Sequence, residues 1–185
     1  YKMFQSAEDE MVAFQISYTV EKAVVMHNDI AELYWTFIGN AFTDKINNLK
    51  EVIFDLRSKG LVPILAHPER YSYFQNKPDE LISLIEQGCL FQGNLGSLIG
   101  LYGKRSKKCL KTLIKHNLIQ FMATDVHHHN SKNILLLDEG IKELDKLVGK
   151  EDSKSLISEN PLKVIYNQEI KIKNPKNFKS FLKFF

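Results

Sequence analysis

Residues 61–71 read LVPILAHPERY, an apolar run that is followed at once by polar and charged side chains. A short apolar run of this kind is typical of a β-strand that is buried on both faces. We expect Pro63 to lie near the beginning of that strand, because proline has no N–H to donate within a sheet. The preceding residues 48–59 place apolar side chains at helical spacing, and Gly60 suits the end of a helix. The stretch therefore predicts a helix followed by a buried strand, one unit of an α/β fold.

The same order of elements recurs along the chain. Strand patterns start about 28 residues apart, which is the length of one strand-helix unit. The predicted strands span residues 61–66, 89–93 and 118–123, and the predicted helices span residues 48–59, 78–87, 106–116 and 132–148. Successive units of this type form a parallel sheet that is either open or closed into a barrel. We expect one domain over residues 1–185.

Both ends of the chain carry weaker patterns. Residues 32–42 contain the run LYWTFI and predict a further strand, whereas residues 1–30 favour helix. Near the other end, Asn160-Pro161 predicts a turn and residues 162–166 (LKVIY) predict a short strand. A closed barrel usually needs eight units over about 250 residues. The four or five units recognisable here predict an incomplete barrel.

Composition describes an ordinary soluble domain. The 185 residues are 44% hydrophobic and carry a net charge of +3, with no apolar run of the roughly 18 residues that span a bilayer. No nucleic-acid-binding motif or secretory signal is visible, so we expect a cytoplasmic protein. Its two cysteines are expected to be buried thiols. One group of basic residues predicts either a solvated helix face or a surface for anionic partners: Lys104, Arg105, Lys107 and Lys108.

Two polar clusters follow predicted strands, where active sites of α/β folds form. The first begins at His67, and the second contains Asp125 and His127, which are separated by one residue. In extended backbone, alternate side chains point the same way, so both could reach one centre, and His67 would approach from a neighbouring strand. A carboxylate with imidazoles suits Zn, Mn or Fe and leaves positions for water and substrate. The alternative is a hydrogen-bonded loop with incidental histidines.

Arg70 lies three residues after His67 and is a candidate for phosphate binding, since a guanidinium can contact two phosphate oxygens at once. The alternative is a salt bridge to Glu69 or to a carboxylate elsewhere. Tyr71 is a candidate for substrate contact or for packing at the rim of the site. Asn94, after the second predicted strand, is a further candidate for substrate binding.

Four strings together resemble one known family: PILAHPERY, GCLFQ, YGK and ATDVHHH. The chain is similar to the polymerase-and-histidinol-phosphatase (PHP) superfamily, in the branch of bacterial protein-tyrosine phosphatases linked to capsule and exopolysaccharide synthesis. The resemblance implies a distorted β/α barrel that binds two or three divalent metal ions, first of all Mn, with Fe or Zn as alternatives. It also implies hydrolysis of phosphotyrosine on a bacterial tyrosine kinase that controls polysaccharide export. His67, Asp125 and His127 would be metal ligands, and Arg70 would bind phosphate beside the catalytic Asp125 and His127.

The chain departs from the family pattern near its beginning. The family starts with a His-x-His strand and has a metal-bridging Glu where Gly39 stands here. Glu8 and Glu10 are the candidates for a further acidic ligand. These departures predict a barrel that is incomplete at the N-terminus. They also keep two other functions open, a binding protein that has lost catalysis and a hydrolase of small phosphate esters of the histidinol-phosphatase type.

Overall fold

In the computed structural model, the fold is described for residues 24–26, 34–38, 49–124, 137–176 and 178. Its strands are β1 (Val24–Met26), β2 (Tyr34–Ile38), β3 (Leu61–Ala66), β4 (Leu90–Asn94) and β5 (Phe121–Ala123). Its longer helices are α2 (Leu49–Ser58), α6 (Gly103–Lys115) and α7 (Leu137–Val148). The short ones are η1 (Pro68–Arg70), α3 (Ser72–Asn76), α4 (Glu80–Glu86), α5 (Leu95–Ile99), α8 (Lys150–Lys154), η3 (Ser155–Glu159) and α9 (Asn160–Ile165).

The strands form one sheet in the order β1-β2-β3-β4-β5. The pairs β2–β3, β3–β4 and β4–β5 are parallel, so the predicted parallel α/β arrangement is confirmed. Pro63 lies in the first half of β3, before the strand begins to pair with β4 at Ile64, as expected. The third predicted strand is shorter than expected and starts at Phe121. Before it, Gln120 bonds to Phe91 of β4 through both its backbone N–H and its side-chain oxygen.

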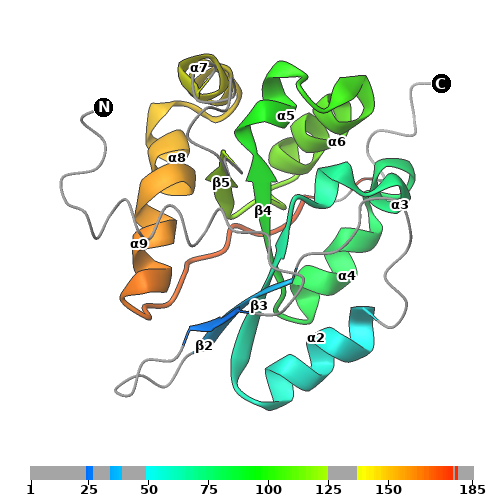
Figure 1. The fold of residues 1–185 in the computed structure, drawn as a ribbon, viewed down its shortest axis with the longest axis vertical. Helices are drawn as coiled ribbons and strands as arrows, with labels where there is room; N and C mark the ends of the chain where they lie inside the picture. Colours follow the sequence, from blue (N-terminus) through cyan, green and yellow to red (C-terminus); the bar gives the residue numbers. More distant parts are fainter. Residues whose placement is uncertain (1–23, 27–33, 39–48, 125–136, 177, 179–185) are drawn as a thin grey trace.

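In β3, β4 and β5 both faces of the sheet are buried, as parallel strands require. Neighbouring residues of these three strands alternate between two hydrophobic clusters. Leu65, Phe91 and Met122 pack with α2, α4, α5, α6 and α7 on one face. The other face has a smaller cluster, consisting of Val62, Ile64, Leu90, Phe121, Val164 and Ile170. Figure 1 shows α2, α4 and α6 on one side of the sheet, with α8 and α9 on the other.

Two predictions for the ends of the chain are wrong. Val24–Met26, within the region expected to be helical, is strand β1 and pairs antiparallel with β2. Residues 162–166 are not a strand after a turn, because Asn160–Ile165 is helix α9 with its proline in the first turn. Leu162, Val164 and Tyr166 alternate as in a strand, but in the helix only Val164 is buried and Tyr166 is 66% exposed. Val164 packs in the smaller cluster on the sheet, which the alternation in the sequence does not reveal.

The described strands form an open five-stranded sheet, so closure into a barrel stays a prediction. At β5, the side chain of Asn160 in α9 donates to the carbonyl oxygen of Gln120 at 2.8 Å, which attaches this helix beside the strand. None of the described helices has the length and apolar character that a bilayer crossing requires.

The parallel strands end close together at one edge of the sheet. Ala66 of β3 pairs with Gln92, and two residues further Asn94 of β4 pairs with Ala123 of β5. Each predicted polar cluster begins just after one of these strands. The topology therefore brings the carboxyl ends of β3, β4 and β5 to the place where a site in an α/β fold is expected.

Candidate active site

His67 is the first residue after β3. Its backbone N–H donates to the carbonyl oxygen of Gln92 at 2.7 Å, which extends the ladder between β3 and β4 by one residue. The backbone of His67 is left-handed, with φ of 50° and ψ of 48°, a conformation that non-glycine residues adopt rarely and at an energetic cost. The side chain is 1% exposed. A strained, buried histidine at the carboxyl end of a parallel strand is the arrangement expected of a functional residue.

Glu69 connects the turn after β3 to the junction of β4 and α5. Its carboxylate oxygen Oε1 accepts hydrogen bonds from the backbone N–H of Asn94 at 3.1 Å and from the hydroxyl of Ser97 at 2.7 Å. Complete burial raises the pKa of the Glu69 carboxyl, while His67 and these hydrogen bonds act in the opposite direction. Among the described residues Glu69 forms no ion pair with Arg70, because Oε1 bonds to Asn94 and Ser97 and Oε2 has no polar partner. A salt bridge between Arg70 and a carboxylate elsewhere stays an alternative. Glu69 holds two strand ends in register.

Asn94 ends β4 and caps helix α5. Its side-chain oxygen Oδ1 accepts from the backbone N–H of Gly96 at 2.8 Å, as an N-cap asparagine commonly does. Its amide nitrogen Nδ2 is buried and has no hydrogen-bond partner among the described residues, and the same holds for Oε2 of Glu69. An unsatisfied buried donor costs about 1–3 kcal/mol, which makes a bound partner favourable. The predicted contact between Asn94 and substrate stays a prediction.

Arg70 belongs to the same tight turn as His67, whose carbonyl oxygen accepts from the Arg70 backbone N–H at 2.9 Å. The guanidinium carbon of Arg70 lies 4.1 Å from the centre of the Tyr102 ring, in a cation–π contact. Tyr71 is 1% exposed and packs in the main core, edge-to-face with Phe74. Tyr71 therefore packs in the core and not at the rim of the site as expected, and its predicted substrate contact stays a prediction.

The second cluster, with Asp125 and His127, lies outside the described residues, but the elements on either side of it are described. Before it, β5 ends at Ala123 beside Asn94. After it, α7 packs on α5, where a Cβ placed on Gly140 would lie 3.1 Å from Leu95 Cβ and 3.2 Å from the Leu95 carbonyl oxygen. Glycine allows this close approach. Both flanks of the segment that carries the predicted ligands therefore lie beside the junction of β4 and α5.

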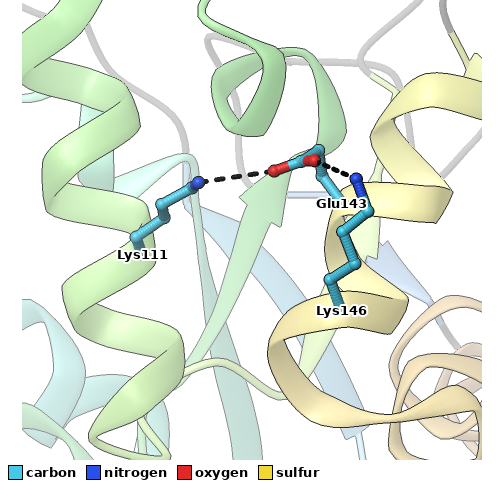
Figure 2. Close-up of polar contacts among 3 residues, drawn as sticks. All are labelled: Lys111, Glu143 and Lys146. Carbon is cyan, nitrogen blue, oxygen red and sulfur yellow. Dashed lines mark hydrogen bonds and ion pairs between the residues drawn. The ribbon is translucent and has the colours of Figure 1, made fainter.

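An ion-pair network also joins α7 to α6. Figure 2 shows Glu143 of α7 between Lys111 of α6 and Lys146 of α7. The Lys111 Nζ to Glu143 Oε2 distance is 3.4 Å, and the Lys146 Nζ to Glu143 Oε1 distance is 2.8 Å. Hydrogen bonds from Lys146 first, then from Lys111, lower the pKa of Glu143. The network therefore links α7, the helix that follows the segment with Asp125 and His127, to α6, which packs against η1.

The metal prediction is tested only in part. Of the predicted ligands, His67 is described, whereas Glu8, Glu10, Asp125 and His127 lie outside the described residues. Within the described residues, no three His, Cys, Asp or Glu side chains form a group that could hold a metal ion. The buried imidazole of His67 suits Mn, Fe or Zn, and a complete site would need ligands from the second cluster.

Cysteine chemistry is not supported. Cys89 and Cys109 are both buried free thiols, as predicted. Burial raises the pKa of each thiol to about 12, so neither forms the thiolate that a nucleophile requires at neutral pH.

Comparison with known proteins places this site in a family. The sequence model of the capsular polysaccharide synthesis family CpsB/CapC matches residues 15–166, which is most of the chain. The chain belongs to the CpsB/CapC family. The match spans all three parallel strands that lead into the candidate site.

Individual members of the family support this assignment. Tyrosine-protein phosphatase YwqE of Bacillus subtilis is 35% identical over 121 residues, which cover 65% of this chain and 47% of YwqE. Tyrosine-protein phosphatase CpsB of Streptococcus agalactiae is 30% identical over 116 residues, covering 60% of this chain and 47% of that protein. The chain thus spans about half the length of these relatives.

The fold agrees as well. A chain from the crystal structures of YwqE from Bacillus subtilis and CpsB from Streptococcus pneumoniae, described as unique metal-dependent tyrosine phosphatases, superposes with a TM-score of 0.67. It is 33% identical, and the match covers 74% of this chain and 54% of that one.

Sequence reasoning missed two site residues. The sequence suggested Glu69 only as an ion-pair partner of Arg70. Its position between the end of β3 and Arg70 is the signal that could have indicated a buried carboxylate joining two strand ends. Tyr102 stands in the YGK string between Gly100 and Gly103, and two glycines around one aromatic residue indicate a turn that presents its side chain.

Proposed function

We propose that the protein is a metal-dependent phosphoric monoester hydrolase that removes phosphate from tyrosine residues of a bacterial tyrosine kinase controlling capsular or exopolysaccharide synthesis. One observation carries the proposal. The strained, buried His67 and the candidate phosphate-binding Arg70 share one turn after β3, beside the ends of β4 and β5, in a family whose named members are tyrosine phosphatases. Asp125 and His127 follow β5 in sequence by two and four residues.

The metal ions are part of the proposal, with Mn as the first candidate and two or three ions in a complete site. His67, Asp125 and His127 would hold them, with Glu8 or Glu10 as a further ligand. When bound, divalent ions polarise the phosphoryl group and lower the pKa of the attacking water. Arg70 would bind the phosphoryl oxygens, and its charge would stabilise the transition state as negative charge develops there.

A surface on α6 favours a peptide over a small ester. We call the side chains of Lys104, Arg105, Lys107 and Lys108 the α6 basic surface; three of them are exposed and Lys107 is half-buried. None of the four has an ion pair with another described residue. Cations in the first turns of a helix are unfavourable next to its positive end, so an anionic partner would stabilise them. Because α6 packs against η1, a phosphotyrosine in an acidic peptide could contact Arg70 and this surface together.

The experiment measures hydrolysis of a phosphotyrosine peptide by the chain with Mn²⁺, before and after treatment with EDTA. Turnover is expected to require metal and to be abolished in His127→Ala, which removes a proposed ligand. Arg70→Ala is expected to retain metal and lose on the order of 10²-fold in kcat, the effect of one transition-state contact. Cys109→Ser is the matched control and is expected to retain turnover per folded molecule. Full turnover after metal removal would exclude the proposed mechanism.

A second candidate is a family member that binds its partner without hydrolysis. The presence of Gly39 at the position where the family has its metal-bridging Glu favours it. Metal content, measured with turnover, separates the two functions. Metal-loaded protein that binds the phosphopeptide but hydrolyses no phosphate ester would support the binding function.

A further inference from the structure

The contact between Arg70 and Tyr102 joins two separate parts of the candidate site. Arg70 ends the turn after β3, whereas Tyr102 lies in the short link between α5 and α6. The guanidinium lies over the face of the ring, 4.1 Å from its centre. A cation over a ring face is attracted by the π electrons of the ring, and the guanidinium carries several N–H donors in a planar fork. The ring can therefore orient Arg70 while donors remain for phosphate.

The link that carries Tyr102 is built around glycines. Gly100 and Gly103 have positive φ angles of 93° and 89°, which reverse the chain within a few residues on either side of Tyr102. The ring also lies close to Gly96 of α5, where a Cβ would be only 3.0 Å from Tyr102 Cε2 and 3.1 Å from Asn94 Oδ1. Any larger residue at position 96 would push against the ring or against the cap of α5. The position of the ring is thus determined by the same junction that places Asn94.

We propose that Tyr102 is a positioning residue for Arg70, holding the guanidinium in the orientation that binds the phosphoryl group of the substrate. The inference rests on the proposed function of Arg70 as the phosphate ligand. A free arginine side chain samples many rotamers, and each must be lost when phosphate binds. A ring that restricts the guanidinium beforehand lowers this entropic penalty and raises affinity for phosphate and for the transition state.

The test is a double-mutant cycle with Tyr102→Leu and Arg70→Ala. Tyr102→Leu removes the aromatic face and is expected to lower kcat/KM for a phosphotyrosine peptide by about tenfold, within the range of cation–π energies. Inorganic phosphate affinity, measured by calorimetry, is expected to fall to a similar extent. In the Arg70→Ala background, Tyr102→Leu is expected to have almost no further effect on either quantity, because Tyr102 acts through Arg70. Tyr102→Phe keeps the ring and is expected to restore both values.

The matched control is Tyr73→Leu, which removes another tyrosine that lies under a cation, Lys77, at 5.8 Å from the ring centre. It is expected to leave phosphate affinity per folded molecule unchanged. Equal effects of Tyr102→Leu in the presence and absence of Arg70 would show a purely structural ring and overturn the inference. So would unchanged phosphate affinity in Tyr102→Leu.

Failure of the inference and failure of the proposed function are distinguishable. If the chain binds phosphate through Arg70 and Tyr102 as described but hydrolyses no ester, the catalytic function fails and the positioning role stands. If turnover depends on Arg70 but is the same with leucine at position 102, the hydrolase stands and the positioning role fails. If Arg70→Ala leaves phosphate affinity unchanged, the inference is overturned together with the assigned role of Arg70.

Discussion

A single carboxylate, that of Glu69, connects the two strand ends that frame the candidate site. Its two hydrogen-bond donors are the backbone N–H of Asn94, the last residue of β4, and the hydroxyl of Ser97 in α5. Such a buried link is sensitive to loss of the acceptor, because the donors remain buried without a partner. The carboxylate itself is disfavoured by burial, as its raised pKa indicates.

We therefore expect Glu69→Ala and Glu69→Gln to differ. Glu69→Ala should lower the free energy of unfolding by about 1–3 kcal/mol for the donors left unpaired, and by more where packing is lost. Glu69→Gln keeps an acceptor oxygen and removes the buried charge, so it should be much less destabilising. Urea unfolding at neutral pH measures both values. Equal losses in the two variants would show that the carboxylate charge, and not its acceptor role, stabilises the turn.

At the scale of elements, the packing of α7 determines where the predicted ligand segment rejoins the described fold. Close contact between Gly140 and Leu95 sets α7 against α5, and Glu143 connects α7 with α6. Exposed or half-buried ion pairs of this type contribute modestly and are screened by salt.

The Glu143 network predicts a pH dependence of stability. Because the folded pKa of Glu143 is lowered, its stabilising effect is fully present above the unfolded pKa and is lost as the pH falls through the folded pKa. Glu143→Gln should therefore have a slightly lower Tm than the parent chain at pH 7, and the difference should vanish in acid below the folded pKa. Thermal unfolding at low salt measures the effect, and Lys142→Gln, at an exposed position one residue away, is the control. A Tm difference that persists in acid would contradict the ionic origin.

The α6 basic surface predicts a selective change in substrate binding. The double change Lys104→Glu and Arg105→Glu should raise KM for an acidic phosphotyrosine peptide by about fivefold, as expected for two surface charges. The value of kcat should change little. Turnover of p-nitrophenyl phosphate should stay unchanged, since a small ester does not reach this surface.

Lys150→Glu provides the matched control for this pair. Lys150 is an exposed lysine in the first turn of α8, which lies away from α6 in Figure 1. High salt should remove the difference in peptide KM between the α6 variant and the parent chain. Equal loss for peptide and small ester would show that the α6 charges act on the site itself and do not select a peptide.

At the scale of the whole molecule, the chain matches about half the length of its curated relatives. A form extended upstream by a His-x-His strand is expected to bind Mn²⁺ more tightly and to hydrolyse phosphotyrosine faster than the 185-residue chain. The reason is that metal affinity grows with the number of pre-organised ligands. Metal content and peptide hydrolysis of both forms measure this, and the same extension with both histidines replaced by alanine is the control. An extended form that binds metal but hydrolyses no ester would leave the binding function as the better account.

The local patterns of the sequence were sufficient for the central architecture. The strands at residues 61–66 and 89–93 and the helices that precede them were predicted to within a few residues, and they are parallel as expected. Period and capping are properties of neighbouring residues, so they are readable without knowledge of the fold. The family resemblance, carried by the strings around His67 and Asp125, is confirmed by the match to the CpsB/CapC family over residues 15–166.

The tertiary structure decided what depends on partners that are distant in sequence. The apolar alternation at Leu162, Val164 and Tyr166 fits a strand, yet these residues belong to helix α9 and its C-cap, of which Val164 is buried against the sheet. Glu69 and Arg70 are adjacent in sequence, yet one bonds to Asn94 and Ser97 and the other lies on Tyr102. Sequence determined which chemical groups stand at the strand ends. The fold decided which partners these groups contact. The reason is that burial and long-range packing set the energy of each side-chain contact, whereas separation along the sequence does not.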